Sequence, residues 1–155
     1  MTVHMSRRQN GYFRHGIERE IPLVHELILK DDGPALAAWL DRHPEDVENR
    51  FRLKTPLLIV VKHDAYDCFQ VLLQRGTNMD GYNPQNETAI FIAVRLNKTR
   101  IIRDLIAREA SILPEDRMAR TVTEILISRD DVETLKFVHM QKGNLIATCT
   151  ARSSN

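Results

Sequence analysis

The sequence predicts an all-α protein, a solenoid of four helix-turn-helix units joined by hairpin loops. The first observation is helical: short stretches carry apolar residues at the spacing of one helix face, begin at a capping residue and end at a turn former. The second is periodic: these stretches recur every 33 residues along the 155-residue chain. A single hairpin cannot bury both of its apolar faces, so each unit has to be covered by its neighbours.

The stretch from Thr55 to Gly76 is the best-preserved unit. Thr55 can cap a helix with its hydroxyl, and Pro56 suits the first helical position because its missing N–H needs no partner there. Gly76 suits the left-handed position that follows a helix. The pair Asp64-Ala65 interrupts the apolar pattern, which predicts a short helix, a tight turn and a second helix.

The same pattern appears in three further units at steps of 33 residues. Thr55 aligns with Thr88 and then with Thr121, and Pro22 opens the unit that precedes them. The expected first helices are residues 22–30, 56–63, 89–96 and 122–129, and the expected second helices are residues 34–42, 66–75, 99–108 and 132–142. Asp or Asn stands in every turn between the two helices, where we expect its side chain to cap the second helix.

Particular residues in each unit match a known repeat motif, Thr-Pro-Leu-His followed by a paired Leu-Leu and then Gly-Ala-Asp. They are Thr55-Pro56-Leu57, Leu72-Leu73 and Gly76-Thr77-Asn78 in the second unit, Thr88, Ala93, Leu105 and Ala110 in the third, His25 in the first and Thr121 in the fourth. On these residues the chain resembles the ankyrin-repeat family over residues 21–143. The resemblance implies repeats at about 21–53, 54–86, 87–119 and 120–143, stacked into an L-shaped section with a concave groove. We expect a flexible, polar and basic arm at residues 1–20 and a tail outside the repeat pattern at 144–155.

Three departures from the motif concern the loop glycine that precedes the capping Thr. Leu53, Asn86 and Ala119 stand at that position. Asn tolerates the left-handed backbone conformation, whereas Leu and Ala adopt it at a cost. We therefore expect divergent repeats of modest stability.

Composition gives no sign of catalytic chemistry. The acidic pairs Asp31-Asp32 and Asp130-Asp131 lie in predicted turns, the six histidines lack metal-ligand spacing, and Cys68 and Cys149 suggest no disulfide framework. We therefore predict a non-enzymatic protein with no catalytic, metal or cofactor-binding residues. The longest apolar run, residues 57–61, is too short to span a bilayer, so we expect no membrane partner and a cytoplasmic location, with the nucleus left open.

The ankyrin resemblance implies that partners bind at the hairpin tips and at the last exposed positions of the first helices. Of the 24 positions that this register selects, nine are Lys or Arg and three are acidic, in a chain whose net charge is +1. The candidate partner-binding residues are Arg52, Lys54, Lys62, His63, Tyr82, Gln85, Arg95, Leu96, Arg117, Met118, Arg120 and Arg129. A groove of this composition favours an acidic protein surface or segment with a few apolar anchors.

We therefore predict a monomeric protein-protein interaction module, an adaptor or an inhibitor. A more specific version rests on similarity to short NF-kappa-B-inhibitor-like ankyrin proteins and is an analogy at the level of the fold. Nucleic acid ranks below protein as a partner because the basic positions lack stacked aromatic residues. The alternative is a truncated or spliced ankyrin segment of a larger scaffold protein with no independent partner.

Overall fold

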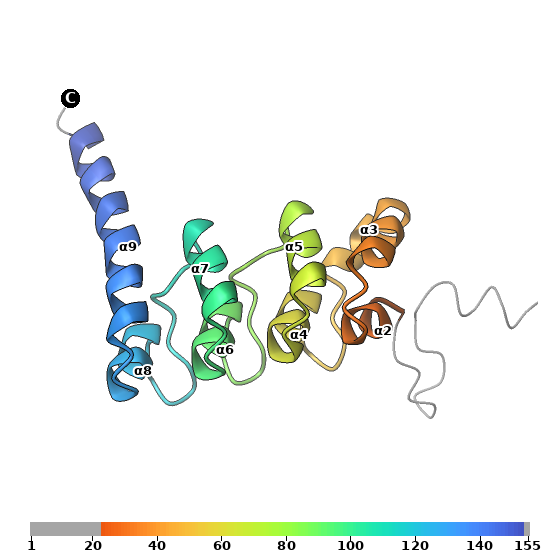
Figure 1. The fold of residues 1–155 in the computed structure, drawn as a ribbon, viewed down its shortest axis with the longest axis horizontal. Coiled ribbons are helices and arrows are strands. Elements are labelled where there is room, and N and C mark those ends of the chain that lie inside the picture. The colour runs from red at the N-terminus through yellow and green to blue at the C-terminus, as the bar shows by residue number, and fades with distance from the viewer. Residues whose placement is uncertain (1–22, 154–155) are drawn as a thin grey trace, which may run out of the picture.

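The computed structural model describes residues 23–153, and within them helices pair into four stacked hairpins. Figure 1 shows the first helices in one row and the second helices in another. The first row comprises α2 (Leu23–Leu29), α4 (Pro56–His63), α6 (Ala89–Arg95) and α8 (Val122–Ser128). The second row comprises α3 (Gly33–Arg42), α5 (Tyr66–Gln74), α7 (Thr99–Ala107) and α9 (Val132–Ser153), and a short 3₁₀ helix, η1 (Pro44–Val47), follows α3. The predicted all-α stack of four units is confirmed.

Capping residues fix where the first helices begin. The Thr55 hydroxyl accepts a hydrogen bond from the Leu58 N–H, and a proline opens α4 directly after it. Thr121 forms a capping box with Glu124, in which each side chain accepts a hydrogen bond from the other residue's backbone N–H. Gly76 follows α5 with φ +72°, the left-handed conformation that its position predicts.

The turns within the hairpins correct one expectation about capping. Asp31, Asp64, Asn97 and Asp130 each lie in the left-handed region, with φ between 51° and 60°. A turn this tight needs one left-handed residue to end the first helix, and Asp and Asn accept that conformation better than other side-chain-bearing residues. Within its own turn, a side chain caps the second helix in two cases: Asp32 caps α3, and Asp131 accepts a hydrogen bond from the Thr134 N–H in α9. Asp31 instead accepts a hydrogen bond from the Cys68 N–H in the first turn of α5, one hairpin later.

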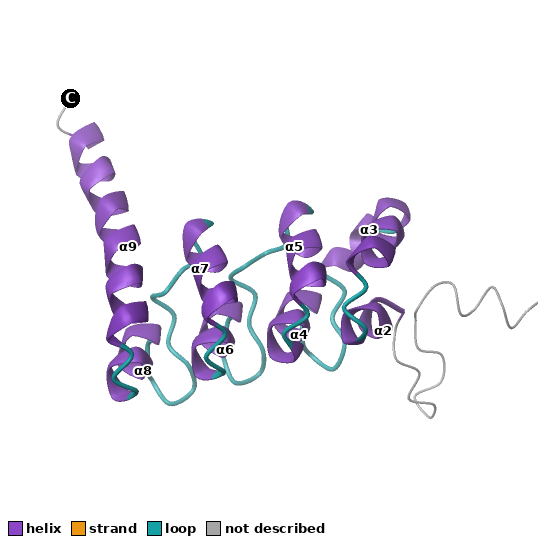
Figure 2. Cartoon of the chain, in the orientation of Figure 1, coloured by secondary structure: helices purple, strands orange, loops and turns teal. Residues whose placement is uncertain are grey.

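Loops that connect successive hairpins extend beside the row of first helices (Figure 2). Isolated antiparallel bridges close two of these loops, between Phe51 and Lys54 and between Tyr82 and Thr88. Leu53, Asn86 and Ala119 have φ values of 65°, 61° and 55°, which confirms that all three positions are left-handed.

The hydrophobic core runs the length of the stack. Residues 56–61 of α4 and 89–94 of α6 are all buried, because each of these two helices packs against a first helix on either side. From the second row, Leu72 and Leu105 are fully buried at equivalent positions in α5 and α7. The middle of the molecule is therefore its most completely packed part.

The last helix is longer than the repeat pattern predicts. We expected the second helix of the fourth unit to end at Lys142, but α9 continues to Ser153 and extends beyond the other helices in Figure 1. Gly143 follows Lys142 and is typical of a helix end, but the sequence beyond it contains no proline and includes good helix formers such as Leu145 and Ala147, so the helix can continue. The predicted arm at residues 1–20 lies outside the described residues. No helix within the described part of the chain is long and apolar enough to cross a membrane.

Candidate functional site

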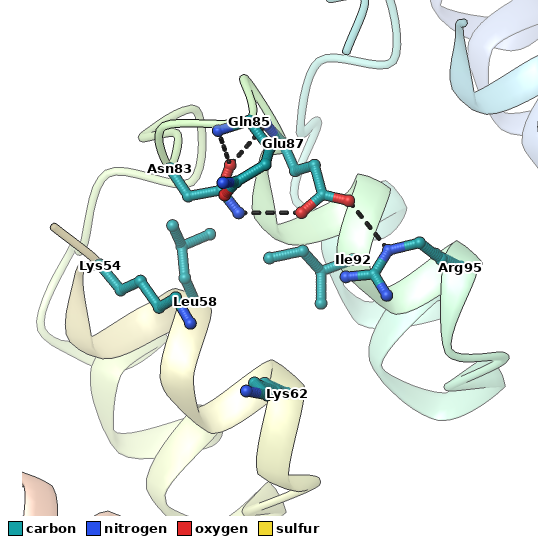
Figure 3. A pocket seen from close by; sticks show the side chains of 8 residues that line it. All are labelled: Lys54, Leu58, Lys62, Asn83, Gln85, Glu87, Ile92 and Arg95. Atoms are coloured by element: carbon teal, nitrogen blue, oxygen red, sulfur yellow. Dashed lines mark hydrogen bonds and ion pairs between the residues drawn. The ribbon is translucent and has the colours of Figure 1, made fainter. Parts of the chain in front are cut away.

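A pocket of about 340 Å³ opens between α4 and α6, beside the loop that joins the second and third hairpins. Figure 3 shows Lys54, Leu58 and Lys62 on the α4 side, with the loop residues and the α6 residues facing them. Leu58 and Ile92 are buried apolar residues that contribute to the lining. The residues that line the pocket are Lys54, Leu58, Lys62, Asn83, Gln85, Glu87, Ile92 and Arg95. Four of the candidate binding residues, Lys54, Lys62, Gln85 and Arg95, therefore meet in one place.

The α4 side of the pocket is positively charged. Lys62 is exposed, Lys54 is half-buried, and neither takes part in an ion pair with another described residue. Burial lowers the pKa of His63, and the charges of Lys62 and Lys54 lower it further. The two lysines therefore produce a positive potential that reaches their neighbours.

The same field reaches the first hairpin. Burial lowers the pKa of His25 to about 4, with further contributions from His63, Arg52 and Lys54. The His25 ring lies edge-on to Phe51, with 4.4 Å between the ring centroids. Positive charge thus gathers where the tip of the loop at residues 51–54 meets the ends of α2 and α4.

On the opposite side of the pocket, the charges of Glu87 and Arg95 neutralise each other. The Arg95 guanidinium donates a hydrogen bond to Glu87 Oε1 at 2.9 Å, and Asn83 Nδ2 donates one to Glu87 Oε2, also at 2.9 Å. Asn83 Oδ1 accepts hydrogen bonds from the backbone N–H groups of Gln85 and Glu87. This network fixes the loop geometry and holds the Glu87 carboxylate in place.

Two other predicted cations in the groove have internal partners. Arg120 donates to Asp116 Oδ2 at 2.6 Å, and only 4% of the Asp116 side chain is exposed. This hydrogen bond is the main cause of the lowered pKa of Asp116, whose other oxygen accepts from the Met118 and Arg120 N–H groups. Arg129 donates to the backbone carbonyls of Val94 and Arg95 and so caps the end of α6 from the next hairpin.

The remaining candidates lie outside the residues that line this pocket. Arg52 and Arg117 are exposed at the loop tips, and Arg117 donates its backbone N–H to Gln85 O. Tyr82 and Met118 are exposed apolar residues, whereas Leu96 is partly buried against the core. The repeat register places these residues on one face but does not reveal which cations are already neutralised. Asp116 was missed by the sequence analysis, although its spacing of four residues from Arg120 was a usable signal.

The sequence predicts no catalytic or metal-binding set of side chains. Among the described residues, no three His, Cys, Asp or Glu side chains lie close enough together to hold a metal ion. Burial raises the pKa of the Cys68 thiol to about 12, and the neighbouring Asp31 carboxylate adds to the shift. The thiolate of Cys68 is therefore scarce at neutral pH, and this cysteine is a poor nucleophile.

Stacked helical hairpins with loops projecting beside the first helices have the architecture of an ankyrin-repeat protein. No family model matches the sequence. The chain is distantly similar to inversin, an ankyrin-repeat protein. Inversin of Gallus gallus is 25% identical over 126 residues, which cover 79% of this chain and 11% of that protein. Inversin of Mus musculus is 28% identical over 95 residues, which cover 60% of this chain and 9% of that protein. The chain thus spans about a tenth of the length of these relatives.

Proposed function

We propose that this chain is a non-enzymatic protein-binding module that holds an acidic segment of a partner protein in its concave groove. The observation that carries the proposal is the pocket between α4 and α6, which combines two lysines outside any described ion pair with a buried apolar lining. Such a site complements a segment that carries both acidic and aliphatic side chains.

The distant similarity to inversin supports the general class, because ankyrin repeats commonly bind proteins. Arg52, Lys54, Lys62 and Arg117 take the leading place in the proposed interface, since none of them is neutralised by a described carboxylate. In this proposal Arg95, Arg120 and Arg129, which have partners within the chain, shape the binding surface and do not bind the acidic residue directly.

A charge-reversal experiment tests this interface. We compare Lys62→Glu/Arg117→Glu with the matched control Arg108→Glu/Lys136→Glu, which makes the same charge change at two exposed positions, one directly after α7 and one in α9. Each protein serves as bait, and retained partners are quantified by mass spectrometry at low and high salt. A partner that binds wild type and the control, is lost from the groove variant and weakens with salt supports the proposal. A partner retained equally by both variants counts against it.

The NF-kappa-B-inhibitor-like version is a finer proposal within the same function. It rests on the size and repeat number of the chain and on the resemblance described above. Its test is direct binding of a purified NF-kappa-B dimer to wild type and to the two double variants. Equal binding by all three proteins, or no binding, counts against it.

A second candidate follows from the length of the relatives. Because the chain corresponds to about a tenth of inversin, it can instead be an ankyrin segment of a larger scaffold with no independent partner. In that case the wild-type bait and the Lys62→Glu/Arg117→Glu bait retain the same proteins in equal amounts.

A further inference from the structure

The two lysines of the pocket occupy the positions that hold an ion pair in the next repeat. A step of 33 residues takes Lys54 to Glu87 and Lys62 to Arg95. The same step takes Arg50 to Asn83. The second repeat therefore carries three cations where the third repeat has a neutral, hydrogen-bonded set.

The third repeat shows what fits this position. Its Glu87 carboxylate lies between Asn83 and Arg95, at 2.9 Å from a donor on each side, and only 12% of the Glu87 side chain is exposed. In this repeat, a carboxylate between the loop and the end of the first helix is therefore stabilised by hydrogen bonds on both sides.

The fourth repeat also supplies its own carboxylate. Arg120, which aligns with Lys54 and Glu87, is paired with Asp116 at 2.6 Å. The second repeat lacks such a group: Arg50 donates to the backbone carbonyl of Tyr82 at 3.2 Å, and Lys54 and Lys62 have no ion-pair partner among the described residues.

We infer that the second repeat takes its missing carboxylate from the bound partner. A Glu or Asp side chain enters between Lys54 and Lys62, in the place that the Glu87 carboxylate holds one repeat later. An aliphatic neighbour in the same segment contacts the apolar part of the pocket lining, where Leu58 of α4 faces Ile92 of α6 (Figure 3). This inference rests on the proposed function and names its partner as a segment with an acidic residue beside an aliphatic one.

The decisive variant is Lys54→Glu, which gives the second repeat the acidic residue that the third repeat has. The new carboxylate can pair with Lys62, as Glu87 pairs with Arg95, and so fills the site from within. A loss of binding then comes without a loss of folding, which thermal unfolding verifies. Lys136→Glu, an exposed change of the same charge on α9, is the matched control.

The probe is a fluorescein-labelled, end-blocked peptide in which one Glu is flanked by leucines, compared with otherwise identical Gln and phosphoserine peptides. We expect the Glu peptide to bind wild type and the control variant alike, and the Gln peptide to bind at least about tenfold more weakly, as the loss of a charged contact predicts. Lys54→Glu should weaken the Glu peptide by a similar factor. The pKa of His63, followed by NMR, should rise when the Glu peptide binds, because the carboxylate offsets the charges of Lys62 and Lys54.

Several results overturn the inference. They are equal binding of the Glu and Gln peptides, unchanged binding by Lys54→Glu, or no binding of the Glu peptide at millimolar concentration. Binding of the phosphoserine peptide alone also overturns it, and indicates a phosphorylated partner instead. A cellular partner can be lost from Lys62→Glu/Arg117→Glu while the peptides bind Lys54→Glu as tightly as wild type. In that case the proposed function stands and this inference fails.

Discussion

His25 is the single residue with the clearest predicted effect of pH. Burial and nearby positive charge lower its pKa in the folded protein to about 4, below the ordinary 6.5 of the unfolded chain. Between these values the unfolded chain binds the proton more readily, so the contribution of His25 to stability falls as pH drops from 6.5 towards 4. From pH 7 to pH 5 we expect this histidine to account for a loss of roughly 1–2 kcal/mol in the free energy of unfolding.

Urea unfolding at pH 7 and pH 5 measures this loss, with His25→Gln as the variant that cannot titrate. The variant should lose less stability than wild type on acidification, by about the amount given above. Equal losses in the two proteins would show that neither burial nor the charges of His63, Arg52 and Lys54 lower the pKa of His25 in the folded protein.

Leu53 is a residue whose replacement by glycine should stabilise the protein. It has φ 65° at an exposed loop tip, where its side chain is 64% exposed and contributes little packing. A left-handed conformation costs a side-chain-bearing residue about 1–2 kcal/mol, and glycine avoids most of that cost. Glycine also loses more conformational entropy on folding, which offsets part of the gain. We expect Leu53→Gly to raise the free energy of unfolding by about 0.5–1 kcal/mol in denaturant titrations.

The matched control is Asn86→Gly at the equivalent position. Asn already tolerates φ 61°, and its side chain donates a hydrogen bond to the Glu115 carbonyl that glycine cannot replace. This variant should therefore gain nothing. If both glycine variants are destabilised alike, backbone strain is not what limits these loops.

Among the secondary-structure elements, α5 and α7 carry packing positions that can be compared directly. Leu72 and Leu105 are equivalent, fully buried residues, so replacing either with Ala leaves a cavity between the helix rows. We expect Leu72→Ala or Leu105→Ala to lower the free energy of unfolding by about 2–5 kcal/mol. Thermal and urea denaturation measure the change.

Leu113→Ala makes the same chemical change at a loop position that is 81% exposed. It should alter stability by no more than about 0.5 kcal/mol. If Leu72→Ala and Leu105→Ala cost less than about 1 kcal/mol each, the assigned register of the repeats is wrong.

The element boundaries were largely predictable because periodicity and capping act locally. The structure begins α4, α6 and α8 at the residues expected from Thr55, Thr88 and Thr121. The extension of α9 was not predictable, since the repeat pattern describes where a unit usually ends and not whether a helix can continue. The Asp and Asn residues were located correctly in the turns, but the expected capping of the second helix of the same unit holds only for Asp32 and Asp131.

For the candidate site, the sequence predicted which residues share a face of the molecule but not which side chains pair with one another. Register placed Lys54, Lys62, Gln85 and Arg95 around what proves to be one pocket. It could not show that Arg129 caps the carbonyls of α6, because that contact depends on side-chain reach between hairpins. The net charge of the predicted face therefore overstated the number of cations that lack a partner within the described residues.

Bonds between successive hairpins hold the molecule together as a whole. Asp31 accepts a hydrogen bond from the Cys68 N–H, and Glu48 accepts hydrogen bonds from Thr77 and Asn78. Lys98 pairs with Asp64 at 3.0 Å across the next boundary. Since each hairpin depends on its neighbours, stability should be greatest where both sides are covered.

Hydrogen exchange followed by NMR tests this gradient. Amide protons in α4 and α6 should exchange more slowly than those in α2, whose far side is not packed against another described helix. Equal protection in α2, α4 and α6 would show that the stack opens only as one cooperative unit.

The contrast between Lys54 and Glu87 has a consequence for how such a protein changes over generations. Codons for lysine and glutamate differ by a single base. On the inference made above, one point mutation can therefore turn a repeat that holds its own carboxylate into one that takes a carboxylate from a partner, or the reverse. Neither change touches the buried residues of α4 or α6. On that inference, the choice of partner can change without any change in the residues that hold the helices together.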